Sequence, residues 1–115
     1  MIALKKAYRV KRNSEFQDIL RTGKSFANRE LVIYYKKSKD QDHFRIGISV
    51  GKKIGNAVTR NRIKRLIREA FTQFNDKIIP EVDIIIIARK PTIHMDGNQM
   101  KRSISHLLKK QRLFK

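Results

Sequence analysis

The stretch of residues 52–74 constrains the fold of this chain more than any other part of it. It reads KKIGNAVTRNRIKRLIREAFTQF. Its apolar residues recur at the three-and-four spacing of a helix with one buried face, at Ile63, Leu66, Ile67, Ala70, Phe71 and Phe74. Gly55 supplies a turn before the helix, and the Asn56 side chain can accept a free first-turn N–H as an N-cap. The stretch therefore predicts a long helix that packs one side on a core.

The other side of this predicted helix is cationic. At about 100° per residue, the side chains opposite the apolar stripe are Asn61, Lys64, Arg65 and Arg68. A merely solvated basic face would carry acids for pairing one turn away, yet the first acid after Lys52 is Glu69. Repulsion along such a face is unfavourable unless a polyanion binds it. We interpret it as a nucleic-acid-binding surface, with simple solvation as the alternative.

The whole chain has the charge expected of a protein that binds a polyanion. Its 28 Lys and Arg against 10 Asp and Glu give a net charge of +18 on 115 residues. This length predicts one domain, residues 1–115, with a modest core and a basic, loosely ordered segment over residues 1–12. No apolar run has the length of a membrane span, and the N-terminus does not read as a signal peptide. We therefore expect a cytoplasmic protein with no membrane partner.

The remaining patterns predict the element order α-β-β-α-β-α. A short first helix opens at Asn13 or Ser14, with Ser14 and Gln17 at capping-box spacing, and stops at Gly23. Strands are predicted over residues 31–35 and 44–50, joined by a polar hairpin loop, with a possible extra short strand at 25–27. The apolar run 82–88 predicts a central strand covered on both faces. A last helix begins at Asp96 or Asn98 and buries Met100, Ile104, Leu107 and Leu108.

No arrangement of residues predicts catalysis by the polypeptide alone. His43, His94 and His106 share no metal-ligand spacing, and the few acids are scattered, so we assign no catalytic residue and no metal site. Without cysteine, the chain has no thiolate nucleophile or disulfide. The aromatic residues leave two interpretations open. Phe16 and Tyr34 are either ordinary core residues or stacking platforms for single-stranded bases in a groove.

Three segments together resemble the protein subunit of bacterial ribonuclease P. They are residues 27–35 (ANRELVIYY), 44–71 (FRIGISVGKKIGNAVTRNRIKRLIREAF) and 84–91 (IIIIARKP). The most specific part is Gly55-Asn56-Ala57-Val58-x-Arg60-Asn61-Arg62-x-Lys64-Arg65, which is similar to the RNR signature of that family. The resemblance implies an α+β, ribosomal-protein-like two-layer sandwich with a left-handed β-α-β crossover. Pattern reasoning alone would not predict this hand, because about 98% of such connections are right-handed.

The resemblance also implies a function and its partners. A protein of this kind joins a large catalytic RNA, and the holoenzyme removes the 5′ leader of precursor tRNA. The RNA with its Mg²⁺ carries out the chemistry, so we expect no cofactor on the protein, and no protein partner is evident. The implied RNA-binding residues of the RNR helix are Asn56, Arg60, Asn61, Arg62, Lys64, Arg65 and Arg68. The implied leader-binding cleft holds Phe16, Leu20, Tyr34, Lys52, Lys53, Arg89 and Lys90.

Two positions depart from the pattern of the family. Leu20 stands where relatives often carry a second cleft aromatic, so only apolar contact is expected there, and Gly51 replaces a serine. Two other classes compete with the accessory subunit. One is a different RNA-binding protein, such as a ribosomal protein, and the RNR signature argues against it. The other is a free-standing nuclease, for which a carboxylate or histidine cluster is missing.

Overall fold

The computed structural model describes residues 8–115 as a mixed four-stranded sheet with three α-helices, which confirms the predicted α+β class and element order. The strands are β1 (Lys24–Ala27), β2 (Leu31–Lys37), β3 (Arg45–Ser49) and β4 (Val82–Ala88). The helices are α1 (Asn13–Thr22), α2 (Ala57–Gln73) and α3 (Gly97–Lys110). Three short 3-10 helices lie in the connections between these elements: η2 (Lys52–Ile54), η3 (Asn75–Lys77) and η4 (Lys90–His94). The possible extra short strand at residues 25–27 is present in the structure as β1.

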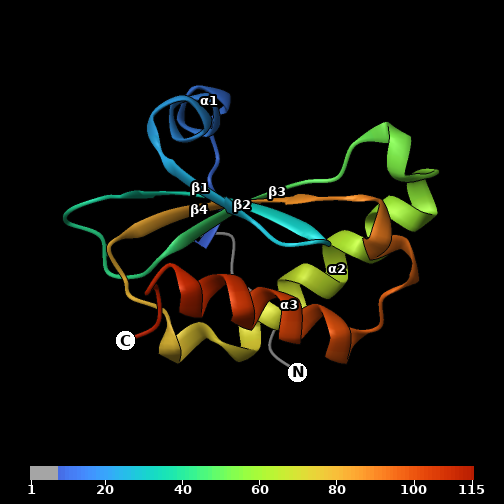
Figure 1. Ribbon diagram of the computed structural model, residues 1–115. Helices are drawn as coiled ribbons and strands as arrows, with labels where there is room; N and C mark the ends of the chain where they lie inside the picture. Colours follow the sequence, from blue (N-terminus) through green and yellow to red (C-terminus); the bar gives the residue numbers. More distant parts are fainter. Residues whose placement is uncertain (1–7) are drawn as a thin grey trace.

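The sheet and the pair α2 and α3 form the two packed layers, and α1 lies across the other face of the sheet (Figure 1). Strand β2 shows why the layers form: Leu31, Ile33 and Tyr35 are buried, and the residues between them are half-buried. The buried set joins the apolar faces of α2 and α3 in one core. The predicted buried residues of both helices all lie in this core, except that Phe74 is half-buried against Phe114.

Strand β4 is the centre of the sheet, whose order is β1-β2-β4-β3. It pairs antiparallel with β2 and parallel with β3, and six of its seven residues are buried. This confirms the prediction of a central strand. The predicted hairpin between β2 and β3 is wrong, because β4 lies between them. A strand this apolar requires cover on both faces and a partner on both edges, and only the middle of the sheet provides that.

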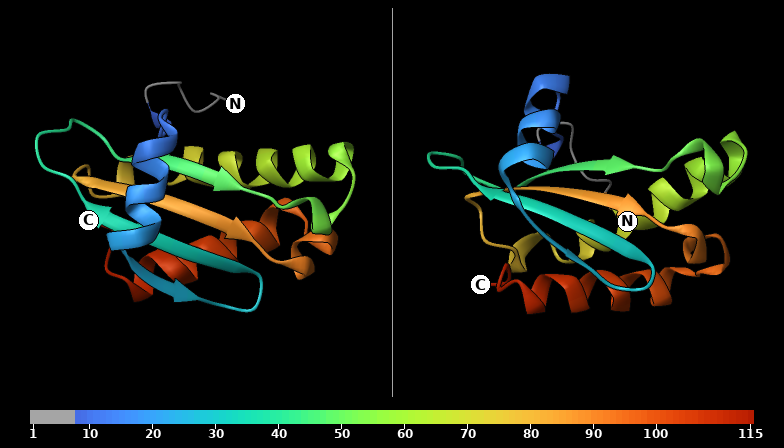
Figure 2. Two further views of the ribbon diagram at one scale, coloured as in Figure 1. Left: turned by 90° about the horizontal axis from the view of Figure 1, so that it is seen from above. Right: turned by 45° about the horizontal axis from the view of Figure 1, so that its top comes forward.

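The crossover from β3 through α2 to β4 is left-handed, as the resemblance implied. In the left view of Figure 2, β3 and β4 point the same way, and α2 lies behind them. This rare hand places α2 along the free edge of β3, away from α1. The cationic side of α2 therefore faces outward, beside the edge of the sheet.

The helix ends follow local side-chain chemistry, with one exception. Asn56 caps α2 by accepting from the backbone N–H of Thr59 at 2.9 Å, and Asp96 forms a capping box with Gln99 at the start of α3. At Gly23 the backbone N–H closes the last turn of α1 by donating to the Ile19 carbonyl. Helix α1 starts at Asn13, one of the two predicted starts, but the predicted capping box at Ser14 is wrong, because Arg12 holds the cap position and makes no side-chain cap.

Charged residues attach α1 to one end of the sheet. The Arg45 guanidinium of β3 donates to both carboxylate oxygens of Asp83 at 3.0 and 2.7 Å, and it also contacts Glu15 of α1 at 2.8 Å. On the same side of α1, Lys36 of β2 contacts Asp18 at 2.6 Å. Both contacts lie on one side of α1, so the helix covers one part of the sheet face and leaves another part open.

The N-terminal segment was expected to be loosely ordered over residues 1–12, and residues 1–7 lie outside the described part. The next three residues run along the free edge of β3. The Tyr8 ring stacks on His43 with 3.9 Å between ring centroids, and the Val10 backbone N–H donates to the Ile46 carbonyl at 2.8 Å. These contacts bring Arg9 next to the same edge, where it forms an isolated bridge with Ile46.

Candidate nucleic-acid interface

The cations of α2 divide into a half-buried row and a more exposed set. Arg60, Lys64 and Arg68 recur every four residues, and all three are half-buried. Asn61 and Arg65 are exposed on the outer side of the helix. The nearest acid to Arg65 is Glu69, one turn away at a loose 3.8 Å. The predicted outward cationic face is therefore present, and its contacts with RNA stay a prediction.

Arg68, the last cation of this row, lines a small cavity at the free edge of β3. The cavity has a volume of about 190 Å³ and is lined by Arg9, Val10, Phe16, Ile46, Gly47, Ile48 and Arg68. It contains two cations and no acid. Burial, and then the charge of Arg9, lowers the pKa of the Arg68 guanidinium. Two cations held together without a counter-charge favour an anion between them.

Arg62 differs from its neighbours because its guanidinium is engaged inside the protein. It donates to the backbone carbonyls of Ile93 and Met95, at 3.4 and 2.6 Å, and so holds the end of η4 against α2. A side chain committed in this way acts on stability as well as on any RNA contact. Arg60 is also partly enclosed, and its Nε is the one buried side-chain polar atom without a hydrogen bond among residues 8–115.

Phe16 and Tyr34 lie on the face of the sheet that α1 covers. Tyr34, Ile85 and Gly47 stand in register on three adjacent strands, and the Phe16 ring packs on Gly47. The two aromatics therefore sit two strands apart, or about 10 Å at the ordinary strand spacing. Both side chains are half-buried, so neither is fully enclosed by the protein.

The open part of this face lies one step closer to the end of β4. Val32, Ile87 and Ser49 form the next row in register, and all three are half-buried, whereas Ile85 under α1 is fully buried. Leu20 follows Phe16 by one helical turn, on the side of α1 opposite Glu15 and Asp18. Phe16 and Leu20 thus border the open row on its α1 side.

The four predicted backbone cations stand where β3 and β4 end, beyond the open row. Lys52 and Lys53 are exposed in η2, directly after β3, and Arg89 and Lys90 are exposed directly after β4. Because β3 and β4 are parallel, their ends meet at the same edge of the sheet. The structure therefore brings together the predicted residues of the leader-binding cleft, and their binding of a leader stays a prediction.

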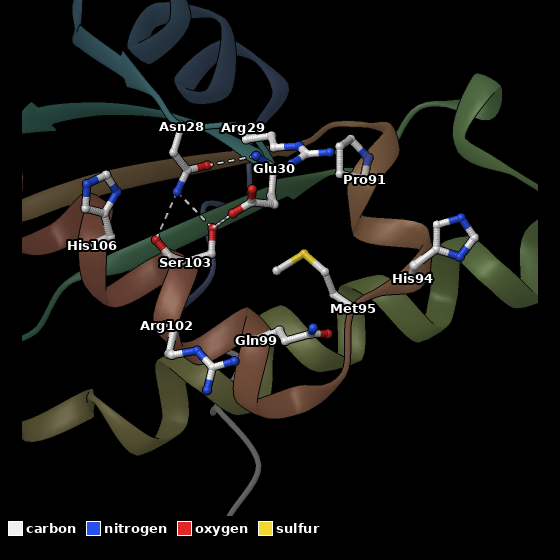
Figure 3. A pocket seen from close by; sticks show the side chains of 10 residues that line it. All are labelled: Asn28, Arg29, Glu30, Pro91, His94, Met95, Gln99, Arg102, Ser103 and His106. Atoms are coloured by element: carbon white, nitrogen blue, oxygen red, sulfur yellow. Dashed lines mark hydrogen bonds between the residues drawn. The ribbon is translucent and has the colours of Figure 1, made fainter.

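Sequence reasoning missed a larger groove on the side of α3, shown in Figure 3. It has a volume of about 580 Å³ and is lined by Asn28, Arg29, Glu30, Pro91, His94, Met95, Gln99, Arg102, Ser103 and His106. Two histidines for which the sequence predicted no catalytic or metal-binding role, His94 and His106, lie at its two ends in this view. They come from η4 and α3, so no local pattern in the sequence indicates that they line the same groove.

The fold and the cationic faces define a compact α+β nucleic-acid-binding domain. The family model described as Ribonuclease P matches residues 4–112. The chain therefore belongs to the ribonuclease P protein family and is a protein component of the holoenzyme that processes tRNA 5′ ends. This membership sets aside the ribosomal-protein and free-nuclease alternatives.

Individual relatives agree with this membership over nearly the whole chain. The ribonuclease P protein component of Oceanobacillus iheyensis is 58% identical over 112 residues, which cover 97% of this chain and 93% of that protein. The solved RNase P protein of Staphylococcus aureus is 50% identical and covers 96% of this chain and 100% of its own, with a TM-score of 0.87. The Thermotoga maritima RNase P protein is 31% identical, covers 89% and 96%, and superposes with a TM-score of 0.81.

Two further observations concern residues 8–115. No helix in this range is long and apolar enough to cross a membrane. Within the same range, no three His, Cys, Asp or Glu side chains gather in a group that could hold a metal ion.

Proposed function

We propose that this protein uses two separate faces, one for the catalytic RNA and one for the precursor tRNA. The α2 face binds the catalytic RNA through Arg60, Lys64, Arg65 and Arg68, with Asn61 as a hydrogen-bonding contact. The open row beside α1 binds the single-stranded 5′ leader. We further propose that Mg²⁺ serves the catalytic RNA and that the complex works in the cytoplasm.

The observation that carries this assignment is the separation of the two faces by the left-handed crossover. The α2 cations lie along the free edge of β3 and form an almost acid-free surface, which suits the closely spaced phosphates of a structured RNA. The α1 face instead combines half-buried aromatics with cations at its rim. Stacking platforms beside backbone cations are the usual means of holding a single strand without reading its sequence.

The direct test is to assemble the holoenzyme. Labelled precursor tRNA is incubated with the protein alone, the catalytic RNA alone, and both together, at low Mg²⁺. Cleavage at the mature 5′ end only with both components is the expected result. Cleavage by the protein alone would contradict the assignment of the chemistry to the RNA.

Salt dependence tests the α2 face separately. Replacing Arg65 or Lys64 by Ala should weaken binding of the catalytic RNA and lower the slope of log affinity against log salt by about 0.7–0.9 per lost phosphate contact. Asn61→Ala should weaken binding and leave that slope almost intact, because an amide displaces no counterion. Loss of affinity with an unchanged slope in the Arg65 variant would contradict a phosphate contact.

A further inference from the structure

We propose that the groove between the β1–β2 turn, η4 and α3 binds one unpaired RNA nucleotide, with the base inside and the phosphate on an arginine of the rim. This inference rests on the proposed function and adds a third RNA contact, apart from α2 and from the α1 face. The groove volume of about 580 Å³ lies within the range of about 300–1,000 Å³ typical of small-molecule sites.

The walls of the groove are held rigidly by side-chain hydrogen bonds. The Asn28 amide donates to the Oγ and to the backbone carbonyl of Ser103, at 2.8 and 3.2 Å, which fixes the β1–β2 turn on α3. The Ser103 hydroxyl donates to the Glu30 carboxylate at 3.0 Å. The side-chain oxygen of Asn28, Oδ1, accepts from the backbone N–H groups of Glu30 and Leu31. Ser103 is only 5% exposed. A preorganised wall of this kind lowers the entropy lost on binding.

The interior of the groove offers what a base requires. Met95, which is 7% exposed, and Pro91 give apolar contact inside the groove, while the exposed His94 and His106 stand at its two ends (Figure 3). Imidazole rings are among the side chains on which splayed-out RNA bases stack. Glu30 presents a carboxylate, an acceptor suited to the exocyclic amino group of a base. The Gln99 amide, whose oxygen is occupied by the Asp96 N–H, keeps its NH₂ group as a donor.

The charges favour a phosphodiester at the rim. Arg29 and Arg102 are exposed and stand on opposite sides of the groove in Figure 3. Neither takes part in the ion pairs found among the described residues. The one acid of the lining, Glu30, accepts a hydrogen bond from the Ser103 hydroxyl. A nucleotide satisfies both the cations and the base-edge donors and acceptors, which a peptide carboxylate does not.

The groove is continuous with the rim of the α1 face. The Arg89 guanidinium donates to the Asn28 backbone carbonyl at 2.9 Å, so the groove begins beside the cations that follow β4. An RNA strand that leaves the open row past Arg89 reaches this groove without crossing α2. The bound nucleotide therefore comes either from the leader or from an adjoining segment of the catalytic RNA, and the experiment below separates these two sources.

The test compares Arg102→Gln and His106→Ala with Lys110→Gln in the reconstituted holoenzyme. All three positions are exposed on α3, and Lys110 lies outside the groove, so it controls for the loss of one charge from the same helix. Affinity is measured for long-leader precursor tRNA, for mature tRNA and, with the protein alone, for the catalytic RNA, over a salt series.

The expected result is a loss of at least about fivefold for both groove variants and little change for Lys110→Gln, since stacking one base contributes about 1 kcal/mol or more. Arg102→Gln should also lower the salt slope by about 0.7, whereas His106→Ala should leave it unchanged. A loss limited to precursor tRNA assigns the nucleotide to the leader. A loss limited to the catalytic RNA assigns it to that partner.

The inference is overturned if both groove variants bind every RNA as tightly as Lys110→Gln does. A groove that binds a protein instead of a nucleotide would give this same result. Arg65→Ala in the same series keeps this result apart from the proposed function. If Arg65→Ala weakens binding of the catalytic RNA and the groove variants do not, only the groove assignment fails. If Arg65→Ala also has no effect, the proposed function fails as well.

Discussion

The ring of Phe16 lies so close to the backbone of Gly47 that a Cβ built on Gly47 would stand 2.8 Å from Phe16 Cε2. Glycine at this position lets α1 approach β3, and the approach in turn places the ring beside the open row of the sheet. The same relationship joins the predicted leader-binding residue to the cavity that holds Arg9 and Arg68. Its disruption should therefore affect both packing and RNA binding.

Gly47→Ala should displace the Phe16 ring and destabilise the protein by about 1–3 kcal/mol, the usual range for overpacking. Gly51→Ala is the matched control, because a Cβ on Gly51 meets nothing within 4 Å. Urea or thermal unfolding of both variants beside the parent measures the difference. Equal stabilities for the two variants would show that the ring moves aside without loss, and the packing argument would then be wrong.

Phe16→Ala and Tyr34→Ala should weaken holoenzyme binding of precursor tRNA and leave mature tRNA almost unaffected. Each stacked base contributes about 1–3 kcal/mol to the binding free energy, and mature tRNA lacks this contribution because it has no leader. Binding of the catalytic RNA should hold, because it uses α2. If the residues are instead ordinary core, truncation of Phe16 would cost about 3–5 kcal/mol of stability. A large drop in melting temperature with both tRNA affinities falling together would contradict the leader assignment.

Arg62→Ala and Arg65→Ala should separate stability from RNA binding. Arg62 donates to the Ile93 and Met95 carbonyls, and hydrogen bonds from a charged group contribute about 1.5–3 kcal/mol. Arg65 is exposed, and its contact with Glu69 is loose. Arg62→Ala should therefore lower the free energy of unfolding measured in urea, and Arg65→Ala should not. If both variants unfold like the parent, the anchoring role of Arg62 is refuted.

The contact between Asp18 and Lys36 should make stability depend on pH in the acid range. The hydrogen bond from Lys36 holds the pKa of the Asp18 carboxyl below its ordinary value of about 3.8. A carboxyl with a lowered folded-state pKa stabilises the fold above that ordinary value, and the contribution is lost as the pH falls through the folded-state pKa. Asp18→Asn should thus lower the melting temperature at neutral pH and converge with the parent in strong acid. Asp42→Asn, at an exposed loop position, serves as the control, and a difference that persists in acid would exclude this linkage.

Sulfate should raise the melting temperature of the free protein. A ligand that binds only the folded state stabilises it by mass action, and the pair Arg9 and Arg68 offers a cavity with two cations and no acid. Arg68→Ala should reduce the sulfate effect without removing it, because the net charge of +18 still attracts anions. Sodium chloride at equal ionic strength controls for screening. An unchanged midpoint in sulfate would count against anion-linked stability.

The sequence alone determined the features that depend on neighbours along the chain. The apolar stripe and the cationic side of α2, the Asn56 cap and the buried character of β4 all follow from periodicity and from side chains a few residues apart, and Asp96 is one of the two caps predicted for α3. Family resemblance added the left-handed crossover, which no local pattern encodes.

The tertiary structure decided everything that depends on which segments meet. The sequence did not place β4 between β2 and β3, because strand pairing is set by which apolar surfaces can be buried together and not by chain order. It likewise could not show that the Arg62 guanidinium donates to the Ile93 and Met95 carbonyls, because these lie 31 and 33 residues further along the chain. The α3 groove is lined by the β1–β2 turn, η4 and α3, and these distant segments form one lining only after the chain packs. Long-range packing of this kind is a property of the folded chain, and so the groove emerged from the structure alone.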